Sequence, residues 1–165
     1  MHFFSLQILS GNWQKINMQP VCFGARDNQY GVLLITKSGL LKTMKLVHKS
    51  GSLKCNTGDP ASYWGCTHVD GYGSNALMTI ITNTDGNATL PPAGDLKPTD
   101  VKINHFYNLD GTTHTSSELV FPDLANKVSV SRGQELQIWY GQDWIDYTED
   151  NNSGTSCVDV YSWYA

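Results

Sequence analysis

The sequence predicts an all-β fold, an antiparallel β-sandwich of jelly-roll-like type stapled by two disulfides. Short apolar or alternating segments recur along the chain, and clusters of turn residues separate them. No segment carries a sustained apolar stripe with the 3.6-residue period of a helix. Alternation leaves one polar face, which antiparallel sheets tolerate. A small closed barrel is the alternative arrangement of the same strands.

The strands follow one another from the N-terminal to the C-terminal part of the chain. The expected strands are residues 13–23, 30–37, 41–49, 76–84, 101–108, 117–121, 127–132, 135–141 and 156–164. Alternation is clear in 135–141, where Leu136, Ile138 and Tyr140 lie on one face. The breaks, such as Asp85-Gly86-Asn87, supply positive or fixed φ angles that strands do not use.

Length and composition predict one folded domain. The 165 residues suit a single domain over 13–165, with 1–12 as an N-terminal extension or vestigial signal. Residues 3–9 are apolar but too short to span a membrane, and no Lys or Arg precedes them, so a signal and an N-terminal edge strand both stay open. A net charge of −4 argues against nucleic-acid binding, and 16% charged residues argue against disorder.

The cysteines and two glycosylation patterns indicate an oxidising compartment. Four cysteines allow three pairings, and no C-x-x-C motif occurs. The economical pairing is Cys55–Cys66, which closes a local loop, and Cys22–Cys157, which joins the first strand to the last. Free thiols of a cytosolic protein are the alternative. Acceptor patterns at Asn87 and Asn151 lie in turn-like segments, so a secreted, extracellular glycoprotein is expected.

An acidic segment between the last two strands is a candidate calcium site. Hard oxygen ligands gathered on a loop suit Ca²⁺, although the spacing does not fit an EF-hand. The candidate ligands are Asp143, Asp146, Glu149, Asp150 and Asn152. The alternative is a solvated acidic loop without an ion.

A second cluster, in the polar segment 55–75, is a candidate carbohydrate site. Sugar rings have an apolar face and a hydroxyl edge, which an aromatic ring and a few fixed polar groups complement. The candidate ligand-binding residues are Tyr63, Trp64, His68, Asp70 and Asn75. The alternative is an ordered loop whose Trp64 caps the core. No G-x-S-x-G or phosphate-loop motif is present, so no catalytic residue is assigned and no enzyme is expected.

Several motifs together resemble a family of small extracellular domains of corals and sea anemones. They are VCFGARDNQYG (21–31), KLVHKSG (45–51), SYWGC (62–66) and GQELQIWYGQDWIDYTEDNNSGTSCVDVY (133–161), in that order. The resemblance implies a secreted, disulfide-bonded protein. Its size also resembles that of the cnidarins, antiviral proteins of the same animals, which implies an antiviral or defensive role.

A different resemblance implies another function. INH (103–105) and GQELQIWYG (133–141) resemble two pieces of PR/SET methyltransferase domains, although Phe106 follows His105 where that family has Ser or Cys.

The function that we predict first from the sequence is lectin-like recognition of glycans on glycoproteins or cell surfaces through loop ends. A structural or adhesion module that assembles by protein contacts is the alternative, and a PR/SET-like methyltransferase is the remote one.

Overall fold

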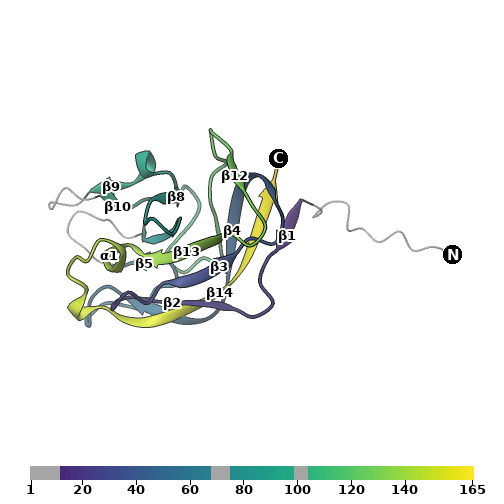
Figure 1. Cartoon of the computed structure of the whole chain (residues 1–165). Coiled ribbons are helices and arrows are strands. Elements are labelled where there is room, and N and C mark those ends of the chain that lie inside the picture. Colours follow the sequence, from purple (N-terminus) through teal and green to yellow (C-terminus); the bar gives the residue numbers. More distant parts are fainter. Residues whose placement is uncertain (1–11, 68–74, 99–103) are drawn as a thin grey trace.

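A computed structural model describes residues 12–67, 75–98 and 104–165 of the chain. Most of its regular structure is β-strand, and neighbouring strands pair antiparallel. Figure 1 shows the strands arranged with the C-terminus at one end and α1 at the other. Within the described residues, no helix is long and apolar enough to cross a membrane.

The larger sheet is built on two long strands, β4 and β14. They pair from Lys54 opposite Ser153 to Leu41 opposite Tyr164, and β1 and β2 share the outer edge of β14. Both β11 and β12 pair with β4 on its other side. The strands are β1 (Trp13–Lys15), β2 (Val21–Gly24), β4 (Gly39–Lys54), β11 (Glu118–Val120), β12 (Val128–Val130) and β14 (Ser153–Tyr164).

The second sheet has the strand order β3-β13-β7-β8, and two small ribbons, β5-β6 and β9-β10, accompany it. Its strands are β3 (Gly31–Leu34), β7 (Thr79–Thr82), β8 (Ala88–Leu90) and β13 (Glu135–Tyr140). The ribbon strands are β5 (Gly65–Cys66), β6 (Ala76–Leu77), β9 (Lys97–Pro98) and β10 (Asn104–Phe106). Among the residues that the structure describes, helical structure is limited to α1 (Gly141–Trp144), η2 (Ala93–Asp95) and η3 (Glu149–Asn151).

The core takes alternate residues of both sheets. Leu46 from β4 and Val160 from β14 are fully buried, as are Ile81 from β7 and Ile138 from β13. Burying apolar side chains between two sheets is the main favourable term for such a fold. The predicted all-β sandwich is confirmed.

Several strand boundaries differ from the prediction. The expected strand 13–23 is two strands, because the Asn17 side chain donates to Asp159 Oδ1 and accepts from the Val160 N–H, which interrupts the edge. Strands β4 and β14 are longer than expected. At Gly51 and Gly154 the φ angles are 76° and 92°, which glycine adopts freely, and a Cβ there would meet a backbone oxygen of the facing strand. The short strands β5, β8 and β9 were not predicted.

Both predicted disulfides are present. Cys22 and Cys157 are direct partners in the β2–β14 register, and Cys55 pairs with Cys66 across the loop that precedes β5. None of the four cysteines is free. The alternative of four free thiols is therefore wrong.

Candidate functional site

The acidic segment faces the loop that joins β2 in one sheet to β3 in the other. Asp27 and Asn28 adopt left-handed φ angles of 63° and 56°, which suit a tight turn in this loop. This turn aims two backbone N–H groups at Asp143, which lies at the start of the segment. Asn28 N donates to Asp143 Oδ1 over 2.9 Å, and Gln29 N donates to Asp143 Oδ2 over 3.1 Å. Asp143 is only 1% exposed, so the turn fixes a buried carboxylate.

Glu149 has two carboxyl neighbours in this segment, but the three side chains do not bring one oxygen each within 4.8 Å of one another. Glu149 forms side-chain hydrogen bonds with Asp143 and Asp146. Burial, these two hydrogen bonds and the charge of Asp143 raise the pKa of Glu149 to about 8, against a smaller lowering by the backbone of Asp27. Carboxylates approach one another only when they share a proton or a cation. The cluster is therefore a place where a cation can replace a proton.

Side-chain oxygens without hydrogen-bond partners lie in the same segment. Gln142 Oε1, Glu149 Oε2 and Asn152 Oδ1 are buried and accept no hydrogen bond. The amide nitrogen of Asn152 donates to Ala25 O over 2.9 Å, and that of Gln142 donates to Thr148 Oγ1 over 3.4 Å. These hydrogen bonds fix the orientation of both side-chain amides, including their oxygens. Buried acceptors normally have a partner, and oxygen ligands are those that Ca²⁺ prefers. These oxygens are candidate ligands for calcium.

The structure places the sequence-predicted metal ligands unequally. Asp143 is buried, Asp146 is exposed and Glu149 lies close to both, whereas Asn152 is buried at the end of η3. The side chain of Asp150 is exposed, and its backbone carbonyl accepts from Arg26 Nη1. The sequence did not point to Gln142, a further candidate ligand. It is a buried polar residue in α1, two positions after the end of β13, and its residue type next to Asp143 was the only signal in the sequence.

The aromatic candidates of the 55–75 segment have different roles. Trp64 is fully buried, and its Nε1 donates to Ser116 O over 2.6 Å, so its ring cannot stack on a sugar. The alternative, that Trp64 caps the core, describes this residue better. Tyr63 is half-buried, and its ring is stacked on His48 with 3.6 Å between the ring centroids. His68 and Asp70 lie outside the described residues.

Asn75 borders a polar cavity of about 520 Å³. The loop after β10 forms the rest of its wall, and Asn108 Nδ2 donates to Asn75 O over 3.1 Å. The same loop contacts the aromatic segment, because Tyr63 N donates to His114 O over 2.8 Å. The lining residues are Asn75, Asn108, Leu109, Asp110, Gly111, Thr112 and Thr113. Amide, carboxylate and hydroxyl groups around such a hollow can bind the hydroxyl edge of a sugar.

The stretch that resembles PR/SET domains has a structural explanation. Gly133, with a φ of 86°, forms the turn that enters β13, and Gly141 begins α1. A Cβ on Gly141 would lie 2.3 Å from His105 O, so this glycine allows close packing against β10. His105 itself is fully buried.

Comparisons with known proteins give one informative similarity. No protein-family model matches the chain, and a search of curated proteins finds no match. Among solved structures, AJLec from the sea anemone Anthopleura japonica superposes with a TM-score of 0.81 and 30% sequence identity. The match covers 93% of this chain and 97% of that one. The similarity therefore extends over nearly the whole fold and includes a cnidarian protein, as the motifs predicted.

Proposed function

Since the chain belongs to the same family as AJLec, a protein whose name marks it as a lectin, we propose that it is an extracellular carbohydrate-binding protein. The two disulfides support the extracellular location, because such bonds persist in oxidising compartments. Glycans of glycoproteins or cell surfaces are the proposed partners. An antiviral or defensive role is a further part of this proposal, and it rests on the cnidarin resemblance.

We propose that Ca²⁺ supports this binding. The observation that supports the proposal is the approach of Glu149 to Asp143 and to Asp146, beside buried oxygens that have no hydrogen-bond partner. These carboxylates would hold the ion together with the oxygens of Gln142 and Asn152, and Asp150 is a further candidate ligand. When bound, Ca²⁺ supplies positive charge and coordination positions for oxygen ligands such as sugar hydroxyls.

The cavity beside Asn75 is the proposed place for further sugar contacts. Asn75, Asn108 and Asp110 offer amide and carboxylate groups on its wall. Tyr63 lies beside the same loop, and His68 and Asp70 remain proposed contacts from the sequence. Trp64 is left out of the set because its ring is buried.

A glycan array probed in calcium, and again after chelation with EDTA, tests the function. We expect binding in calcium, its loss in EDTA and its return when calcium is restored. Asp143→Asn should abolish binding, whereas Asp85→Asn, an exposed acid in the β7–β8 turn, should leave it unchanged. Binding that survives both EDTA and Asp143→Asn would overturn the calcium part and keep the lectin part.

A second experiment distinguishes a lectin function from the alternative function as an adhesion module. Asn75→Ala and Asp110→Asn should each weaken glycan binding without changing calcium binding measured by calorimetry. An array with no binding in either buffer, together with concentration-dependent oligomers in sizing chromatography, would favour the adhesion module.

A further inference from the structure

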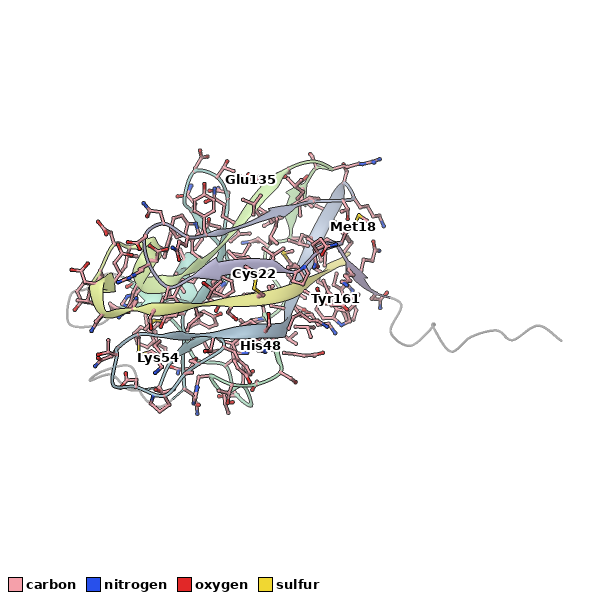
Figure 2. All side chains as sticks on the ribbon, turned by 90° about the horizontal axis from the view of Figure 1, so that it is seen from below. Met18, Cys22, His48, Lys54, Glu135 and Tyr161 are labelled. Carbon is pink, nitrogen blue, oxygen red and sulfur yellow. A yellow bond between two sulfur atoms is a disulfide. The ribbon has the colours of Figure 1, made fainter. Side chains whose placement is uncertain are left out.

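The outward side of the larger sheet carries aromatic rings interleaved with lysines. We name this surface the aromatic–lysine face, which consists of Trp13, Lys15, Lys42, Lys45, Lys49, Tyr161 and Trp163. The strand register puts these residues side by side, since Trp13 faces Trp163, and Tyr161 faces both Lys15 and Lys45. Figure 2 looks onto this sheet and shows Tyr161 on β14, at the end far from Lys54.

The rings and ammonium groups of this face hold one another in place. Trp13 and Trp163 meet edge to face, with 5.1 Å between their centroids. Lys42 Nζ lies 4.6 Å from the Trp163 centroid, and Lys45 Nζ lies 4.9 Å and 5.1 Å from those of Trp13 and Tyr161. Cation–π contacts of this kind orient the rings and keep the positive charges at the surface.

The face has an excess of positive charge in a protein whose net charge is −4. Its four lysines pair with only three carboxylates, because Lys15 and Lys49 share Asp159. Lys42 pairs with Asp123 over 3.4 Å, and Lys45 pairs with Glu118 over 3.8 Å. The side chains of Lys15 and Lys49 are 44% and 49% exposed, whereas that of Asp159 is 8% exposed. The ammonium groups of Lys15 and Lys49 thus face the solvent above a buried carboxylate, whereas the side chains of Lys42 and Lys45 are 33% and 17% exposed.

We propose that the aromatic–lysine face binds a sulfated polysaccharide. The ammonium groups would contact sulfates, and the rings would pack against the C–H faces of the sugars. Membrane insertion suits this geometry less well, because Trp13, Tyr161 and Trp163 are only partly exposed and lie on a paired sheet. The face is also far from the acidic cluster, since Figure 1 shows α1 and the C-terminal end of β14 at opposite ends of the molecule.

Binding to heparin, a sulfated polysaccharide, tests the proposal with the full chain in EDTA. The chelator makes the result independent of the proposed calcium-dependent lectin site. We expect the acidic protein to be retained on a heparin column. The double variant Lys42→Gln/Lys45→Gln should bind heparin about tenfold more weakly, since each lysine beside a polyanion contributes appreciably. The matched control Lys54→Gln/Lys97→Gln removes the same charge at the far end of β4 and in the β9–β10 ribbon, and should bind as the original protein does.

Two further measurements test the contributions of charge and of the sugar rings separately. Glu118→Gln removes the carboxylate beside Lys45, so we expect stronger heparin binding, which a merely destabilised protein would not show. Inorganic polyphosphate, which has charge but no sugar ring, should bind more weakly than heparin. Three results would overturn the proposal: no retention on heparin, equal weakening by the control pair, or binding to anionic lipid vesicles without binding to heparin.

Discussion

Glu149 is a residue whose protonation depends on its neighbours. Its pKa of about 8 arises from burial and from the carboxyl groups of Asp143 and Asp146. Between its ordinary value of 4.5 and about 8, the folded metal-free protein holds a proton that the unfolded chain releases. The free energy of unfolding should therefore fall as the pH rises through this window. A cation that takes the place of this proton would prevent the fall in unfolding free energy.

We predict that metal-free protein is less stable at the upper end of this pH window than at the lower end, and that Glu149→Gln reduces the difference. Added calcium should raise the unfolding midpoint more at the upper end, because the ion no longer competes with the proton. Urea unfolding at both pH values, with and without calcium, measures both effects. A calcium response that grows toward low pH would contradict the assignment.

Trp64 is predicted to matter for stability and not for sugar contact. Trp64→Phe removes the hydrogen bond from Nε1 to Ser116 O and part of a fully buried side chain. The expected loss is about 1–3 kcal/mol of unfolding free energy, measured by urea unfolding. Glycan affinity, measured in buffer without urea where the variant is folded, should not change. Lost affinity with unchanged stability would return Trp64 to the binding site.

At the scale of elements, β2 and β14 supply both sides of the acidic cluster. The β2–β3 loop that holds Asp143 directly follows β2, and β14 begins directly after Asn152. The Cys22–Cys157 bond joins these two strands behind the cluster. The relative position of the two sides therefore depends on this pair of strands.

Removal of this bond by Cys22→Ala/Cys157→Ala should lower the unfolding free energy by about 2–5 kcal/mol. It spans 135 residues, against 11 for Cys55–Cys66, and longer loops restrict the unfolded chain more. We also expect weaker calcium binding, measured by calorimetry at a temperature where the variant is folded. The matched control Cys55→Ala/Cys66→Ala should leave calcium binding unchanged. Equal calcium affinity in both variants would show that β2 and β14 keep the cluster without the bond.

For the whole molecule, the extracellular proposal has a direct consequence at the two glycosylation patterns. Asn87 is exposed in the β7–β8 turn and Asn151 is exposed at the end of η3, and an acceptor has to lie at the surface. We predict that the chain, expressed through a secretory pathway, carries glycans at both positions. Intact mass before and after enzymatic deglycosylation measures this, with Asn87→Gln and Asn151→Gln as site controls. An unmodified secreted chain would contradict the prediction.

Much of the strand arrangement was predictable from local sequence. Alternation in 135–141 predicted β13, because a period of two places Leu136 and Ile138 on one buried face. The split at Asn17 was not predictable, since its cause is a contact with Asp159, which lies 142 residues away. The length of β14 likewise depends on its partner β4, whose glycine at position 51 allows pairing to continue.

The sequence by itself predicted the fold class and the acidic composition of the candidate metal site, because these depend on local periodicity and residue type. Its four cysteines allowed three pairings, and tertiary structure alone decided that Cys22 pairs with Cys157 and Cys55 with Cys66. Tertiary structure also decided that Asp143 is buried and that Trp64 belongs to the core. It also placed Trp13 beside Trp163 and gathered the lysines on one sheet face. These features depend on long-range strand register, which brings distant residues within a few ångströms and which no local pattern specifies.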